Sequence, residues 1–273
     1  MNIIHSTVVG LCSILLVTAA QASVYSTGFD EGVPFYDVGA ALAGQDGWTV
    51  NDANTDVSYF ASLNGSNAGI LGGGGGGYFP PTSQTSVKLS HAHSGLLVGS
   101  VFSVDFAILK STGAHPNNDS FNFFFSAGTD LFVLSLEPSA TEADQLEIVW
   151  YINGSPTRNS GSTNSNIYYE GLYTLGLSFG ASGADATFNA SLITVGAPLS
   201  TMTWGGTLPG DAASSLTSFG VGWNLANANP ANAGDNFIVF DNLSLSHAVP
   251  EPSVLALGML SLGFFSKRRR NRP

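Results

Sequence analysis

The stretch that decides the fold is Val101-Phe102-Ser103-Val104-Asp105-Phe106-Ala107-Ile108. Large apolar side chains occupy every second position from Phe102 to Ile108, and Ser103 and Asp105 lie between them. Successive side chains of a β-strand point to opposite faces of the sheet, so this alternation predicts a strand with one buried face.

The same alternation recurs along most of the chain. Phe121, Phe123 and Phe125 share one face of a second segment. Further segments with this pattern are Leu131–Leu136, Leu146–Ile152, Leu172–Phe179, Ala186–Val195 and Phe219–Trp223. Turn residues separate them, and no segment of the body keeps apolar residues at helical spacing. About a dozen strands predict an all-β domain over residues 23–248, a single antiparallel β-sandwich of the jelly-roll type.

The first 22 residues have the pattern of a secretory signal peptide. An apolar stretch from Val8 to Val17 precedes small residues at Ala20 and Ala22, the positions that signal peptidase requires. A buried N-terminal strand is the alternative. The pattern favours export, with an N-terminal signal helix that signal peptidase removes.

The C-terminal segment, residues 249–273, carries most of the positive charge. An apolar run from Val254 to Phe265 is too short for a typical membrane span, but a cationic block follows it and would stop transfer through a bilayer. This block consists of Lys267, Arg268, Arg269, Arg270 and Arg272. The pattern favours a C-terminal hydrophobic helix over the alternative of a core strand with a solvated basic tail.

Pro250-Glu251-Pro252, the apolar run and the basic end follow one another in the order of the PEP-CTERM sorting signal of Gram-negative bacteria, which this segment resembles. The resemblance implies transient anchoring in the inner membrane and cleavage near Pro250, Glu251 and Pro252 by an exosortase. It also implies a final place on the cell envelope, outer surface or outside the cell, in an exopolysaccharide or biofilm system.

The body between the two ends is strongly acidic. It keeps three cations, Lys88, Lys110 and Arg158, against 18 carboxylates, which is a net charge of −15. Such a domain repels phosphate backbones, so the composition excludes nucleic acid as a partner. Cys12 is the only cysteine and leaves with the signal peptide, so disulfides and cysteine chemistry are excluded as well.

Asp241 is the most informative residue of the body, because it interrupts the apolar row of the segment Phe237–Leu245. That segment and Gly44-Gln45-Asp46-Gly47-Trp48 resemble the last and first strands of concanavalin-like or carbohydrate-module jelly rolls. Asp241 could be turned outward by a β-bulge, could accept hydrogen bonds from a loop, or could bind a cation. By the resemblance, Asp30, Glu31 and Asp241 are candidate Ca²⁺ ligands.

Trp204 is the best candidate for a sugar-stacking residue among the four tryptophans, because Thr201–Gly206 is expected between loops with few apolar neighbours. His91 and His93 share one face of a strand and could hold Zn²⁺ or Cu²⁺, with His115 further along the chain. Without further evident ligands, we interpret this pair as solvated surface.

Catalysis finds little support in the sequence. Glu142, Asp144 and Glu147 have the Glu-X-Asp-X-X-Glu spacing of concanavalin-like hydrolases, but strand geometry puts Glu147 on the opposite face unless a bulge intervenes. We interpret the stretch as a solvated hairpin. Three hypotheses follow: a non-catalytic exported envelope or matrix protein, a Ca²⁺-dependent lectin-like module for extracellular glycans, and a glycan hydrolase that uses this acidic cluster.

Overall fold

The computed structural model describes residues 24–29, 36–37, 39–63, 66–72, 82–110, 119–142, 145–158, 167–195, 200–226 and 236–247. Both terminal segments lie outside these residues, and so do Asp30, Glu31, His115 and Asp144. The only helical element in this part of the chain is the 3₁₀ turn η1 (Thr55–Val57), and no helix there has the length and hydropathy to cross a membrane.

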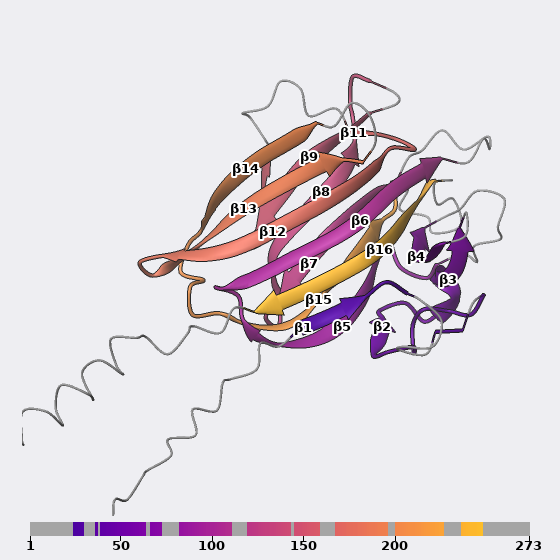
Figure 1. The fold of residues 1–273 in the computed structure, drawn as a ribbon, viewed down its shortest axis with the longest axis horizontal. Coiled ribbons are helices and arrows are strands. Elements are labelled where there is room, and N and C mark those ends of the chain that lie inside the picture. Colours follow the sequence, from indigo (N-terminus) through magenta and orange to yellow (C-terminus); the bar gives the residue numbers. More distant parts are fainter. Residues whose placement is uncertain are drawn as a thin grey trace, which may run out of the picture. The chain divides into compact units, whose positions relative to one another are not determined.

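Two antiparallel sheets form a β-sandwich, which confirms the predicted fold class (Figure 1). The nearer sheet in Figure 1, sheet A, has the order β14-β13-β12-β6-β16-β4-β3, and β1 also pairs with β16. Its strands are β1 (Val24–Thr27), β3 (Ser58–Leu63), β4 (Ser66–Gly72), β6 (Ser100–Lys110), β12 (Leu172–Ser182), β13 (Asp185–Thr194), β14 (Thr201–Leu208) and β16 (Asn236–His247).

Sheet B lies behind sheet A and has the order β10-β9-β8-β7-β15-β5-β2, with β11 beside β9. Its strands are β2 (Trp48–Val50), β5 (Ser86–Leu96), β7 (Ser120–Ser126), β8 (Asp130–Pro138), β9 (Gln145–Ile152), β10 (Ser155–Arg158), β11 (Ile167–Tyr168) and β15 (Ser215–Asn224). Every segment that the alternation predicted as a strand is one.

The core lies between the two sheets and follows the predicted alternation. Phe102 and Phe106 of β6 are each 1% exposed, and they pack against Phe123 of β7 with ring centroids 5.9 and 5.4 Å away. Each fully buried side chain of this size contributes roughly 1.5–3 kcal/mol to the stability of the fold. The alternation therefore determines which face of each sheet is buried in the core between them.

The two ends of the described domain lie side by side in sheet A. Val24 of β1 is opposite Ser246 of β16, and Thr27 is opposite Leu243. The predicted position of the first strand near Trp48 is wrong, because β1 begins at Val24 and Trp48 begins β2 in the other sheet. Four residues without a strong alternating pattern gave no signal for β1.

Two glycines of β15 allow side chains of β7 to lie flat on the outer face of sheet B. A methyl group on Gly222 would overlap the Asn122 amide, and one on Gly220 would overlap the carbonyl oxygen of Leu89 and approach the Phe124 ring. Asn122 and Phe124 point away from the core, yet they are only 5% and 2% exposed.

Candidate functional site

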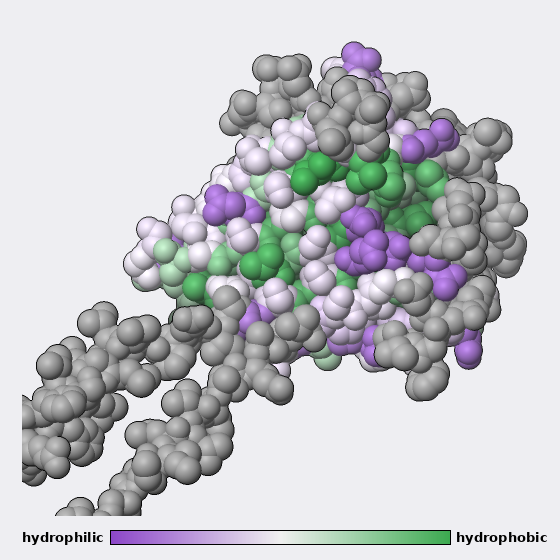
Figure 2. Space-filling model, viewed as in Figure 1, coloured by the Kyte–Doolittle hydropathy of each residue, from purple (hydrophilic) through white to green (hydrophobic). Residues whose placement is uncertain are grey.

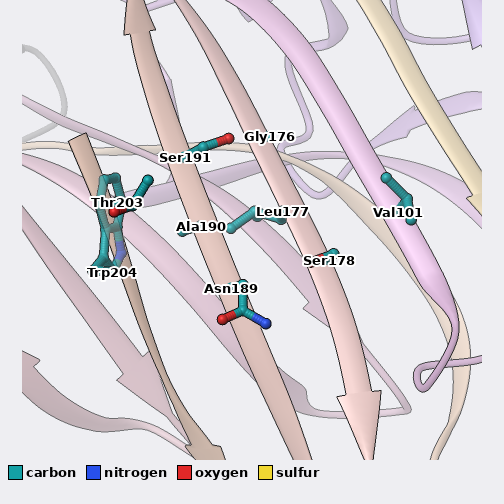
Figure 3. A pocket seen from close by; sticks show the side chains of 9 residues that line it. All are labelled: Val101, Gly176, Leu177, Ser178, Asn189, Ala190, Ser191, Thr203 and Trp204. Atoms are coloured by element: carbon teal, nitrogen blue, oxygen red, sulfur yellow. The ribbon is translucent and has the colours of Figure 1, made fainter. Parts of the chain in front are cut away.

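A shallow hollow of about 450 Å³ lies on the outer face of sheet A, over β6, β12, β13 and β14 (Figure 3). Its lining combines short polar side chains with small or apolar ones. The residues are Val101, Gly176, Leu177, Ser178, Asn189, Ala190, Ser191, Thr203 and Trp204.

The strand register brings these residues together in two neighbouring rows. In the first row Asn189 is opposite Ser178, and Ser178 is opposite Val101. In the second row Ser191 lies between Thr203 on one side and Gly176 on the other. Residues directly opposite each other share a face, so hydroxyl and amide groups from β12, β13 and β14 meet on the outside of the sheet beside Val101 of β6.

Gly176 lines the hollow and leaves room for the Ser191 side chain. A methyl group at this position would lie 2.8 Å from the Ser191 hydroxyl, so the Ser191 side chain occupies the space over Gly176. Figure 3 shows Ser191 reaching toward Gly176, with Asn189 below it on the same strand. The Asn189 side chain lies beside Gly205 of β14 in the same way, since a methyl group there would be 3.1 Å from Asn189 Oδ1.

Trp204 lies at the edge of the hollow. Its ring is not exposed between loops. It belongs to the edge strand β14, opposite the buried Ala190, and its half-buried indole packs against the core. The predicted loop context of this residue is therefore wrong. The Trp204 Nε1 group is buried and has no hydrogen-bond partner among the described residues.

The hollow has no ionisable side chain in its lining. Across β12, β13 and β14 the only charged residue is Asp185, at the start of β13. Ser178, Ser191 and Thr203 offer hydroxyls that donate and accept, and Asn189 offers an amide that does both. Such a surface can hydrogen-bond a neutral polyhydroxylated molecule, and it supplies neither an acid nor a base for catalysis.

The sequence pattern pointed to Trp204 as a binding residue, but not to Gly176, Ser178, Asn189 or Ser191. Near the hollow, the outward-facing positions of β12, β13 and β14 carry serine, threonine, asparagine or glycine. Exposed sheet faces commonly carry charged residues at such positions, so this uncharged composition could have indicated the site. Only the register between strands reveals that these positions form one surface.

Asp241 lies on the outer face of sheet A, as the β-bulge interpretation predicted. The register between β16 and β6 shifts after Asp241, and Asn242 has a φ of 48°. The bulge turns Leu243 back into the core while Asp241 stays outside, directly opposite Asp105. The Asp105 carboxylate accepts hydrogen bonds from Thr174 Oγ1 at 2.5 Å and Asn242 Nδ2 at 2.9 Å.

Asp105, Asp241 and Glu170 border a second hollow of about 470 Å³, whose apolar lining includes Leu109, Leu172 and Val239. On this face Figure 2 shows an apolar area beside a hydrophilic cluster. No group of three or more His, Cys, Asp or Glu side chains in the described residues is placed to hold a metal ion. Since Asp30 and Glu31 lie outside those residues, the Ca²⁺ site with Asp241 stays a prediction.

His91 and His93 point into the sandwich rather than into solvent, so their interpretation as solvated surface is wrong. The His91 ring lies on the Tyr25 ring with centroids 4.0 Å apart, and His93 is 8% exposed. Both belong to β5 on the face of Val87 and Leu89, which packs against the core. The two imidazoles pack against aromatic rings of β1, β2 and β15, and these contacts between distant segments were not visible in the sequence pattern.

The acidic stretch around Glu142 connects β8 to β9. Glu142 is exposed, as the hairpin interpretation predicted, while Glu147 is half-buried on β9 directly opposite Glu137 of β8. Glu137 accepts a hydrogen bond from the Tyr151 hydroxyl at 2.6 Å, and Glu147 accepts one from the Ser139 hydroxyl at 3.3 Å. The two carboxylates that lie opposite each other are therefore Glu137 and Glu147, and Glu137 was not part of the predicted cluster.

Comparison with solved structures identifies the architecture. The winged bean acidic lectin complexed with methyl-α-D-galactose aligns with a TM-score of 0.54 at 11% identity, covering 85% of this chain and all of the lectin. The fold is the jelly roll of the legume lectins.

Two further structures share this jelly roll. Peanut lectin with a nine-residue peptide aligns with a TM-score of 0.52 at 10% identity, covering 84% of this chain and 98% of the lectin. A mutant alginate lyase in complex with an alginate tetrasaccharide has a TM-score of 0.53 at 12% identity, covering 84% of this chain and 98% of the lyase. No family model and no curated protein matches the sequence. The jelly roll thus hosts both binding proteins and enzymes, and function has to be argued from the site.

Proposed function

We propose that this protein is an exported, non-catalytic envelope or matrix protein that an exosortase sorts and processes, and that its sandwich binds neutral glycans in the hollow of sheet A. The observation that carries the binding part is the uncharged lining of hydroxyl and amide groups around Asn189, Ser191 and Thr203. The body has a net charge of −15, and the described lining of this hollow has no carboxylate. A neutral ligand can bind there without competing charge interactions within the lining.

The processing part of the proposal is supported by the position of the two ends. One residue, Ser23, separates the predicted signal peptidase site from Val24, and Pro250 is three residues after His247. Because β1 and β16 pair with each other, the chain enters and leaves the sandwich at one place. If the domain is anchored through its C-terminal segment beside this strand pair, the rest of its surface, including the hollow, can face extracellular glycan.

A Ca²⁺-dependent lectin-like module is the second candidate function. Two carboxylates, Asp105 and Asp241, lie directly opposite each other on β6 and β16, and Asn242 adds an amide beside them. Hard cations take six to eight oxygen ligands, so further oxygens would have to come from residues such as Asp30 and Glu31.

A glycan array separates the two functions. The domain over residues 23–248 is applied to neutral galactose-containing glycans and to acidic alginate oligosaccharides, with and without a chelator. The proposal predicts binding to neutral glycans that the chelator leaves unchanged. Loss of all binding in the chelator favours the Ca²⁺-dependent module, and binding to alginate alone contradicts the neutral site.

A further inference from the structure

A row of apolar side chains crosses the outer face of sheet A beside the second hollow. Leu172 of β12 is directly opposite Ala107 of β6. Ala107 is also opposite Val239 of β16, and Val239 is opposite Ile70 of β4. Because residues directly opposite each other share a face of the sheet, these four side chains form one apolar row. Leu172 is 46% exposed, so the row is open to solvent at β12.

Carboxylates lie on both sides of the apolar row. Asp105 and Asp241 form the neighbouring register row on β6 and β16. Glu170 lies on the other side, where its backbone N–H donates to the carbonyl oxygen of Ile108, and the residue is exposed. All three carboxylates line the hollow of about 470 Å³, and no described residue of that lining is basic. Figure 2 shows this face with its apolar area beside the hydrophilic cluster.

The arrangement of Asp105 and Asp241 favours a cation. The two residues are directly opposite each other on antiparallel strands, where Cβ atoms are about 4.5–5.5 Å apart and like charges repel. Asp105 accepts hydrogen bonds from Thr174 Oγ1 and Asn242 Nδ2, and Asp241 Oδ1 accepts one from the backbone N–H of Asn242 at 2.7 Å. None of these donors carries a positive charge, so a cation bound between the two carboxylates would relieve their repulsion.

The apolar row and the carboxylates together select a class of ligand. The row favours an aliphatic group, because burial removes apolar surface from water. The carboxylates favour positive charge. A hydrated metal ion would leave the apolar row unused. A second copy of this acidic domain or an anionic lipid surface would bring further negative charge to the three carboxylates.

We propose that this hollow binds a small organic cation, an ammonium group carried on an aliphatic chain. The chain lies along the apolar row at Leu172, Ala107 and Val239, and the ammonium group lies between Asp105 and Asp241. The volume of about 470 Å³ is within the range of about 300–1,000 Å³ that is usual for small-molecule sites. The glycan hollow shares none of the described lining residues, so the proposal does not depend on glycan binding.

Methyl resonances of the protein test the site directly. Protein with ¹³C-labelled Ala, Leu and Val methyl groups is titrated with hexylammonium, hexanol and hexanoate at equal ionic strength. We expect hexylammonium to shift the Ala107, Leu172 and Val239 resonances until they saturate, and to leave Ala190 of the glycan hollow unchanged. Hexanol should bind at least about tenfold more weakly, because it lacks the attraction of three carboxylates, and hexanoate should shift none of these resonances.

A shorter ligand and two variants separate the apolar and the charged contribution. Butylammonium lacks two methylenes and should bind at least about threefold more weakly than hexylammonium. Asp241→Asn should weaken hexylammonium at least about threefold and leave hexanol unchanged, and Asp105→Asn replaces it if Asp241→Asn does not fold. Glu142→Gln removes the same charge from the hairpin between β8 and β9, so it is the matched control and should change neither ligand.

Four outcomes would overturn the proposal. The first is the absence of a saturable shift with hexylammonium, and the second is equal affinity for hexylammonium and hexanol. The third is an equal loss of hexylammonium affinity in Glu142→Gln and Asp241→Asn, which would show general attraction to an acidic protein. The fourth is a response of the lining resonances to Ca²⁺ but not to hexylammonium, which would assign Asp105 and Asp241 to a metal.

Discussion

Val24 and Ser246 lie directly opposite each other in the strand pair that β1 forms with β16. This pairing puts the first and last residues of the sandwich at one place, with the two predicted cleavage sites a few residues beyond them. The sandwich therefore needs neither terminal segment for its described contacts, and removal of both should leave it folded.

Intact mass of the protein recovered from its native host tests this processing. We expect a mature chain that begins at Ser23 and ends near Pro250, at the predicted signal peptidase and exosortase sites. The mass also reveals any attached lipid or glycan. Full-length protein with both ends uncut would contradict export and sorting.

Asp52 should make the fold sensitive to acid. Its buried carboxylate accepts hydrogen bonds from the Thr82 and Ser83 hydroxyls and from the backbone N–H groups of Asn54, Ser83 and Gln84. Burial acts to raise the pKa of Asp52, but these hydrogen bonds outweigh it and hold the pKa below its usual value. The stabilisation is therefore present above about pH 4 and is lost as the pH falls further.

Urea unfolding of Asp52→Asn should show a loss of about 1.5–3 kcal/mol at pH 7, the value of hydrogen bonds to a charged group. The difference from the wild type should shrink at pH 3. Asp56→Asn, an exposed carboxylate in the same segment, is the control and should change stability little at either pH. A pH-independent loss in Asp52→Asn would contradict the role of its charge.

Gly220 and Gly222 should tolerate alanine to different degrees. Gly222→Ala overlaps the Asn122 side chain, which can rotate away, and should cost roughly 1–3 kcal/mol. Gly220→Ala overlaps the backbone of Leu89, which cannot move without breaking the sheet, and should cost more. Adding Asn122→Ala should restore part of the stability of Gly222→Ala in thermal unfolding, and leave Gly220→Ala unimproved.

Polysaccharide cleavage should be absent. Glu142 is exposed in a hairpin, and the opposed pair Glu137 and Glu147 accepts hydrogen bonds from Tyr151 and Ser139. We expect wild type, Glu142→Gln and Glu147→Gln alike to release neither reducing ends nor unsaturated ends from neutral polysaccharides or alginate. If the wild type releases product and either variant does not, the protein is an enzyme and the non-catalytic proposal is contradicted.

The sequence predicted the strands well because burial on one face imposes a period of two on the side chains. It was a poorer guide to features that depend on contacts between distant parts of the chain. Trp204 lies in a strand because β13 pairs with it, and His93 is buried because Phe219 covers it. The hollow depends on the register of four strands, since Gly176 and Ser191 are adjacent only through pairing.

The central claim is that the hollow over Gly176 binds neutral glycan, and a pair of glycine variants on β12 tests it most directly. Gly176→Ala fills the hollow beside Ser191, whose hydroxyl can rotate, so the fold should persist. Gly180→Ala is the matched control on the same strand and face, beside Thr187 and outside the hollow.

The measurement is titration calorimetry of both variants and the wild type with a neutral glycan that the wild type binds on the array. The account predicts at least about a tenfold loss of affinity in Gly176→Ala, equivalent to 1.4 kcal/mol, and no change in Gly180→Ala. Equal affinity of the two folded variants and the wild type would contradict it.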